Sequence, residues 1–158
     1  MIFRQLFDSV SSTYSYVLAS RRGGEALIID PVLEKVDRYL KLMEELDLKL
    51  VKAVDTHLHA DHITGLGALR DRTRCITIMG EQSQVDVVSM RIGDGDKLGV
   101  EGLSLDVLYT PATQTIPTAF ISAIACSPAT RCSSAAPAAP ISRTAIRARN
   151  TTLFSTSY

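Results

Sequence analysis

Short runs of strand-forming residues alternate with helical stripes over the first two thirds of the chain. Apolar, β-branched and aromatic residues fill the runs expected to form strands, and turn residues separate them. Helices are predicted where apolar residues recur every three or four positions and charged residues take the other side. Strands are expected at residues 14–19, 26–29, 48–54, 75–79 and 103–109, and helices at residues 36–46 and 66–72.

The segments between these elements read as turns. Two arginines and two glycines at residues 21–24 suit a hairpin turn, and residues 93–99 form a glycine-rich and aspartate-rich hairpin region. Along the first helix, Val36, Tyr39 and Met43 fall on one side, which indicates core packing. Strands and helices that alternate with short loops predict an α/β fold with a layered sheet.

Composition and charge narrow the classes of function. With 158 residues, 46% hydrophobic and 22% charged, the chain has room for one domain with a sizeable core. Its net charge of zero gives no electrostatic sign of nucleic acid or an anionic membrane as a partner. No apolar run reaches the roughly 18 residues of a membrane span, and the N-terminus lacks the pattern of a signal peptide. We therefore predict a cytoplasmic protein.

The composition changes abruptly after Pro111. All 17 acidic residues and all nine glycines lie before that position, as do the five lysines and three histidines. Residues 112–158 contain none of these and are rich in Ala, Ser, Thr, Pro and Arg. A disordered low-complexity tail is one interpretation. It fits poorly with the apolar residues of this segment and with its lack of glutamate, lysine and glycine.

A shifted reading frame is the interpretation we favour for this tail. Back-translation of residues 112–120, with one base restored after the Pro111 codon, permits Gly-His-Thr-Asp-Asp-Ser-Tyr-Ser-Phe. Over residues 126–142 the same frame permits Val-Phe-Thr-Gly-Asp-Thr-Leu-Leu-Ile-Arg-Gly-Thr-Gly-Arg-Thr-Asp-Phe. We interpret residues 112–158 as an out-of-frame translation of a catalytic half, followed by early termination and with little or no native fold.

The chemistry of the chain is concentrated in HLHADH at residues 57–62, directly after an apolar strand. Side chains two positions apart at a strand end share a side, so His57 and His59 can point into one pocket. Asp61 and His62, on the turn that opens the next helix, can complete it. Imidazole and carboxylate together suit Zn, Fe or Mn. A chance cluster on a solvated loop is the alternative, but the chain's only histidines all lie here.

The longer string THLHADHITG at residues 56–65 resembles the metal-binding signature of the metallo-β-lactamase superfamily. Together with IFRQLFD at residues 2–8 and SSTYSY at residues 11–16, it is similar to the persulfide dioxygenase branch, close to glyoxalase II. The resemblance covers about residues 1–111. It implies that this segment is the N-terminal half of a metallo-β-lactamase αββα sandwich, followed by a C-terminal tail that looks non-native.

By resemblance, the activity is oxidation of glutathione persulfide with O₂ to sulfite and glutathione, at a single non-haem Fe(II). His57 maps onto an iron ligand, and His59, Asp61 and His62 onto residues of the metal pocket. In hydrolytic relatives these residues bind a second metal or orient the attacking water. Asp61, beside a metal, is expected to act as an ionised carboxylate. The expected partner is a glutathione-linked small molecule, and a homodimer is left open.

The chain departs from the family pattern after residue 111. The family's other two iron ligands lie in Pro-Gly-His-Thr and Thr-Gly-Asp-Thr turns, whereas here Thr110-Pro111 continues as Ala112-Thr113. Both ligands appear only in the restored frame, so we expect this chain to be inactive. The alternatives are a glyoxalase II-type thioester hydrolase with two zinc ions per site, and a non-catalytic remnant.

Overall fold

Six strands in sequential order form the main sheet of this computed structural model, which describes residues 1–83 and 88–109 and three short strands beyond them. The first three strands are antiparallel neighbours, and the third to sixth run parallel. The strands are β1 (Ile2–Asp8), β2 (Thr13–Ala19), β3 (Glu25–Ile29), β4 (Lys49–Asp55), β5 (Ile76–Gly80) and β6 (Met90–Ile92).

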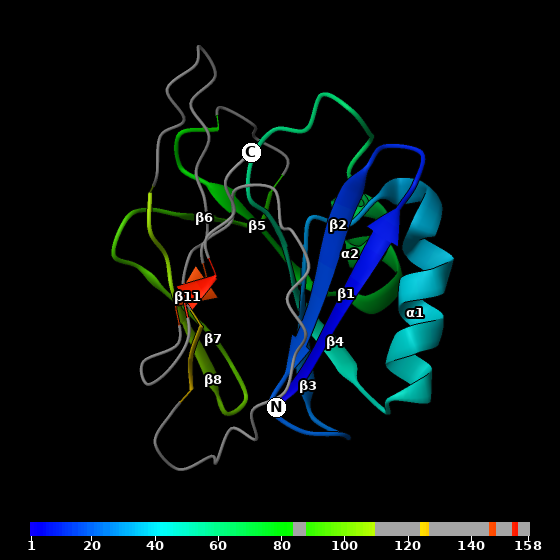
Figure 1. The fold of residues 1–158 in the computed structure, drawn as a ribbon, viewed down its shortest axis with the longest axis horizontal. Helices are drawn as coiled ribbons and strands as arrows, with labels where there is room; N and C mark the ends of the chain where they lie inside the picture. The colour runs from blue at the N-terminus through cyan, green and yellow to red at the C-terminus, as the bar shows by residue number, and fades with distance from the viewer. Residues whose placement is uncertain (84–87, 110–123, 127–145, 148–152, 155–158) are drawn as a thin grey trace.

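Two helices cover one face of this sheet (Figure 1). A 3₁₀ turn, η1 (Leu33–Lys35), leads into α1 (Val36–Glu45) between β3 and β4, and α2 (Leu66–Thr73) connects β4 to β5. Such helical crossovers are how neighbouring parallel strands are joined. The predicted stripe of α1 is confirmed, because Val36, Tyr39 and Met43 are buried against the sheet.

A second sheet covers the opposite face. It consists of β7 (Lys97–Val100), β8 (Leu103–Asp106) and β9 (Ile124–Cys126), and in Figure 1 β7 and β8 lie on the side away from the helices. Leu98 and Leu105 pack against residues of the main sheet in one apolar cluster. The described residues therefore supply helices, sheet and sheet, three successive layers of an αββα sandwich. A separate pair, β10 (Ile146–Arg147) and β11 (Leu153–Phe154), lies further along the chain.

The side chains of β2 alternate between two apolar clusters, one on each face of the main sheet. Tyr16 and Leu18 belong to the cluster under the second sheet, whereas Val17 and Ala19 belong to the cluster under the helices. Successive side chains of a strand point to opposite faces. A nearly continuous apolar run is therefore what a strand covered on both sides requires.

The predicted elements are confirmed within one or two residues, except that 103–109 forms a shorter strand. Six strands were not predicted: β1, β6, β7, β9, β10 and β11. β7 occupies part of the glycine-rich region that we interpreted as turn, and the hairpin turn itself lies at Glu101-Gly102, where Gly102 has φ +72°. The domain boundary at residue 111 and the lack of native fold in residues 112–158 fall largely outside the described residues and stay predictions.

Among the described residues no helix is both long and apolar enough to cross a bilayer.

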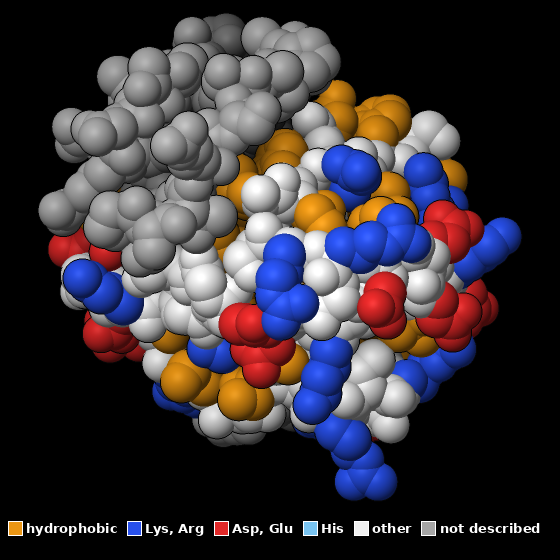
Figure 2. Space-filling view, turned by 90° about the horizontal axis from the view of Figure 1, so that it is seen from below, with side chains coloured by type: hydrophobic (Ala, Val, Ile, Leu, Met, Phe, Trp, Pro, Cys, Tyr) orange, Lys and Arg blue, Asp and Glu red, His pale blue; other side chains and the backbone are white. Residues whose placement is uncertain are grey.

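Figure 2 shows the end of the molecule that lies below in Figure 1, where apolar, basic and acidic side chains are interleaved and no histidine is visible. The histidines lie at the other end of the strands, where the parallel strands of the main sheet finish.

Candidate metal centre

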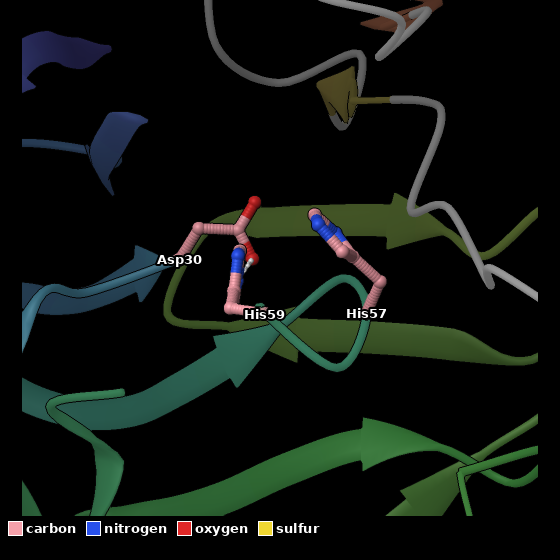
Figure 3. Close-up of side chains that lie close together, drawn as sticks. All are labelled: Asp30, His57 and His59. Carbon is pink, nitrogen blue, oxygen red and sulfur yellow. Dashed lines mark hydrogen bonds and ion pairs between the residues drawn. The ribbon is translucent and has the colours of Figure 1, made fainter. Parts of the chain in front are cut away.

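The candidate site lies where β3 and β4 end side by side. Asp30 follows β3 directly, and the loop with the histidine motif, residues 56–65, follows β4. Parallel strands bring their carboxyl ends to the same edge of a sheet, which is where open α/β folds bind ligands. In Figure 3 Asp30 reaches from the end of β3 toward His59, and the ring of His57 lies on the same side of the motif loop.

Backbone hydrogen bonds fix the motif loop to the segment after β3. The amide of Gly65 donates to the carbonyl of Pro31 over 2.7 Å, and the amide of Leu33 donates to Ile63 over 2.9 Å. The amide of Asp30 donates to Val54 of β4 over 2.8 Å. These bonds hold the two segments in register, so the side chains that face the site stand on a fixed frame.

Asp30, Thr56 and His59 form the inner wall of the site. The Asp30 carboxylate accepts from the Thr56 amide at 2.7 Å and from the Thr56 hydroxyl at 2.9 and 2.8 Å. His59 Nε2 lies 3.2 Å from Asp30 Oδ1, and the Thr56 hydroxyl lies 2.9 Å from His57 Nδ1. The side chains of Asp30 and His59 are only 9% and 4% exposed. A single buried carboxylate thus contacts His59 directly and His57 through the Thr56 hydroxyl.

The backbone of Asp30 is held from below by a chain of hydroxyl groups. Asp30 has φ +49°, a left-handed conformation that aspartate tolerates better than most residues. Its carbonyl accepts from the Ser15 hydroxyl at 2.7 Å, and Ser15 in turn accepts from the Tyr39 hydroxyl at 2.8 Å. The Tyr39 oxygen accepts from the Val32 amide at 3.2 Å. Helix α1 therefore supports the loop that presents Asp30.

Thr13, Asp61 and His62 form the outer wall. The Thr13 hydroxyl at the start of β2 donates to Asp61 Oδ2 over 2.8 Å and lies 3.2 Å from His62 Nδ1. The Asp61 side chain is 48% exposed, whereas that of His62 is 3% exposed. His62 Nε2 is buried, and no group in the described residues pairs with it. A buried imidazole nitrogen without a partner suits a metal ligand.

The two histidines of the inner wall titrate in opposite directions. Burial lowers the pKa of His57, and the neighbouring His59 lowers it further. Burial also lowers the pKa of His59, but the hydrogen bond and the charge of Asp30 outweigh it, so that the net pKa is raised. His57 therefore favours the neutral form that a metal ligand requires.

The pKa values of two further aspartates, Asp61 and Asp55, are also shifted in opposite directions. Burial opposes ionisation of Asp61, but hydrogen bonds from Thr13 and from its own amide, with the nearby histidines, lower its pKa overall, which favours the carboxylate. Asp55, at the end of β4, is 1% exposed. Burial, with the neighbouring Asp30 charge, raises the pKa of Asp55 to about 7.

The structure brings the four predicted site residues together. They belong to two groups of possible ligands, Asp30 with His57 and His59, and His59 with Asp61 and His62, and within each group the ligand atoms lie within 4.8 Å of one another. Sequence reasoning missed Asp30, Thr56 and Thr13 as parts of the site. An aspartate directly after a buried strand, next to the strand that carries the motif, was the signal for Asp30.

The donor set fits a transition metal, but it is incomplete for the expected iron. Imidazoles and carboxylates are suitable ligands, and the buried His62 Nε2 supports a metal pocket. Of the three iron ligands that the resemblance implies, the described residues contain His57 alone. The positions of the other two, after Pro111, lie outside the described residues.

Comparison with known families and proteins shows what this chain is similar to. The metallo-β-lactamase superfamily matches residues 8–84. Persulfide dioxygenase ETHE1 of Mus musculus, a mitochondrial protein by name, is 41% identical over 112 residues, which are 70% of this chain and 44% of the relative. A hydroxyacylglutathione hydrolase of Parasynechococcus marenigrum is 30% identical over 103 residues, 63% of this chain and 41% of the relative.

A solved structure gives the same picture. The crystal structure of ETHE1 from Myxococcus xanthus superposes with a TM-score of 0.70 at 42% identity, covering 80% of this chain and 56% of that one. The predicted resemblance and the α/β fold class are therefore confirmed. The chain spans less than half the length of the curated relatives that it matches.

Proposed function

This chain carries the N-terminal part of a metallo-β-lactamase superfamily domain, and on that premise we propose that it derives from an iron-dependent glutathione persulfide dioxygenase. The observation that carries the proposal is the side-chain cluster itself, in which three histidines and two aspartates converge at the carboxyl ends of β3 and β4. The identity of about 40% to persulfide dioxygenases, against 30% to a hydrolase, favours oxidation over hydrolysis.

The residues of this chain have distinct roles in the proposed reaction. His57 would hold the iron, which when bound supplies open coordination positions for a thiolate and oxygen. His59, Asp61 and His62 would line the pocket, with Asp61 ionised beside the metal. Overall, glutathione persulfide, O₂ and water would give glutathione and sulfite, so that the outer sulfur is oxidised and oxygen is reduced.

We further propose that the chain itself does not turn over, because residues 112–158 are translated out of frame. Two of three iron ligands would then be absent, and iron would bind weakly. The nucleotide sequence around the Pro111 codon tests this directly. A well-covered gene with no missing base at that point would refute the shifted frame.

The activity is tested on a protein translated from the gene with one base restored after the Pro111 codon. With iron loaded, it should consume O₂ and release sulfite when given glutathione persulfide, and the same protein with His57→Ala should not. The chain with the present sequence should show neither product. A homodimer and a cytoplasmic location stay predictions.

The alternative is a glyoxalase II-type hydrolase, supported by the similarity to hydroxyacylglutathione hydrolases. Hydrolysis of a glutathione thioester without O₂ uptake, by the restored protein loaded with zinc, would favour it and contradict the dioxygenase. Soluble chain of the present sequence that binds stoichiometric iron and turns over would contradict both the shifted frame and a non-catalytic remnant.

A further inference from the structure

We propose that strand β1 pairs edge to edge with β1 of a second copy of this chain, antiparallel and about a two-fold axis at Gln5. β1 is the first strand of the main sheet, and among the described residues its only partner is β2. A free sheet edge presents unpaired backbone N–H and C=O groups, which can pair with a strand of another chain. The inference depends on neither the metal nor turnover.

The two edges of the main sheet differ in how well they are protected against such pairing. β6, at the other edge, has only three residues. β1 has seven residues, contains neither proline nor lysine, and pairs with β2 without a bulge. Short edge strands, prolines, lysines and bulges are the features that keep sheet edges apart in monomeric proteins. β1 is therefore the edge that suits a second copy.

The length and the charge of β1 select one register. An axis at Gln5, the middle residue of Ile2–Asp8, pairs every residue of the strand with a residue of the second copy. An axis at Arg4 or Leu6 leaves one end of the strand unpaired and forms fewer backbone hydrogen bonds. The axis at Arg4 also sets two guanidinium groups directly opposite each other, and like charges in that arrangement are destabilising.

Aromatic side chains meet across the proposed interface. In this register Phe3 lies opposite Phe7 of the second copy. Within one chain, Phe3 stacks on Tyr16 with the ring centroids 5.9 Å apart, and Phe7 packs on Tyr14 with the centroids 4.8 Å apart. Pairing thus joins four rings into one row, and it covers Phe7, which is 46% exposed in the single chain. Aromatic pairs are among the stabilising cross-strand pairs.

The axis also brings the two Gln5 side chains together. Gln5 Nε2 is buried, and no group in the described residues pairs with it. A primary amide carries two donor hydrogens and one acceptor oxygen, so two amides related by a two-fold axis can each donate to the other. The second copy therefore supplies a partner for a polar group that the single chain leaves unpaired, which is otherwise costly in a buried position.

The register is tested with single added cysteines in the full chain, each in the background Cys126→Ser/Cys132→Ser. Residues directly opposite each other in antiparallel strands have Cα atoms about 4.5–5.5 Å apart, a separation that a disulfide can bridge. Gln5→Cys should therefore form a covalent dimer under mild oxidation. Arg4→Cys and Leu6→Cys should not, because in this register each faces the other.

A mixture of the Arg4→Cys and Leu6→Cys chains should give the cross-link that neither gives alone. The inference is overturned if Gln5→Cys does not cross-link, or if Arg4→Cys or Leu6→Cys cross-links by itself.

The dimer itself is measured by sedimentation velocity of the full chain. At high concentration the chain should sediment at twice its mass of 17.2 kDa. Phe7→Lys places an ammonium group on the edge and removes the contact with Phe3, so it should raise the dissociation constant by about tenfold or more. Val10→Lys makes the same charge change at a side chain that is 88% exposed and lies outside β1, and it should leave the dissociation constant unchanged.

A native chain that stays monomeric up to about 100 µM, or equal effects of the two lysine variants, would overturn the inference. A monomer that consumes O₂ in the restored form would leave the proposed function standing. Conversely, a dimer whose restored form shows no O₂ uptake would refute the proposed function and leave the β1 interface standing.

Discussion

The inner and outer walls of the site use the same three kinds of residue in different surroundings. Each joins a threonine hydroxyl, an aspartate carboxylate and a histidine. In the inner wall the Asp30 side chain is 9% exposed and receives three donors, whereas in the outer wall the Asp61 side chain is 48% exposed. Hydrogen bonds to a charged group are worth more when water is excluded.

The difference is that the inner wall is hydrogen-bonded to the core of the domain, whereas the outer wall is not. The inner wall continues through Ser15 into helix α1 at Tyr39, so a change there reaches the core. The outer wall ends at the β1–β2 turn and solvent. We therefore expect substitutions of the inner wall to lower stability, and substitutions of the outer wall to alter chemistry at little cost in stability.

The largest effect is expected for Asp30→Ala. The substitution leaves the Thr56 amide, the Thr56 hydroxyl and His59 Nε2 without their buried acceptor. It also places alanine at φ +49°. We expect the free energy of unfolding to fall by about 3–5 kcal/mol, measured by urea denaturation at neutral pH.

Asp61→Ala is the matched control, because it removes the same group from the outer wall. Its exposed carboxylate should change the free energy of unfolding by less than about 1 kcal/mol. Equal losses for the two variants would show that the walls do not differ in the way proposed.

The order of elements could be predicted from the sequence because apolar periodicity decides it. β2 to β5 and helix α1 have strong patterns, and the histidine motif is local, so residues 57–62 were found without any tertiary information. β1 was not predicted. Its side chains do not alternate between buried and exposed, and all but Asp8 are partly buried or exposed, as an edge strand allows.

The inner wall could not be predicted in full, because it joins residues that are distant along the chain. Asp30 and Thr56 meet only after β3 and β4 pair in parallel, and Tyr39 reaches Ser15 only after α1 packs on the sheet. Tyr39 was interpreted as core packing, and it is buried, but its hydroxyl function depends on a contact that periodicity does not report. The outer wall has the same origin, since Thr13 and Asp61 are 48 residues apart.

A smaller effect is expected for Tyr39→Phe, which tests whether the inner wall reaches helix α1. The substitution removes the acceptor of the Val32 amide and the donor to Ser15 in a buried position. We expect a loss of about 1–2 kcal/mol in the free energy of unfolding, again by urea denaturation. Tyr14→Phe is the control, because the half-buried Tyr14 ring packs on Phe7 with the ring centroids 4.8 Å apart. It should change the free energy of unfolding by less than about 0.5 kcal/mol. Similar losses of stability in the two variants would show that the inner wall does not depend on helix α1.

The smallest effect is expected at the turn that carries the outer wall, and it is measured as the loss of native stability when the pH falls. Asp8, at the end of β1, accepts from the Ser11 hydroxyl at 2.7 Å and from the Ser11 amide at 3.0 Å. The Lys35 Nζ atom lies 3.2 Å from Asp8 Oδ1. These contacts, those of Ser11 first, hold the pKa of Asp8 far below its usual range.

The sign of the resulting pH dependence follows from linkage. Because the folded pKa of Asp8 is lowered, the unfolded chain binds the proton first as the pH falls. The stabilisation is therefore complete above the unfolded value of about 4 and is lost progressively as the pH falls from there toward the folded value. Asp8→Asn should flatten this part of the pH profile, and Ser11→Ala should flatten it in part. The measurement is the urea midpoint of each chain from neutral pH to about pH 3. If Asp8→Asn kept the full native slope, the turn would owe its acid sensitivity to other groups, and the outer wall would be anchored elsewhere.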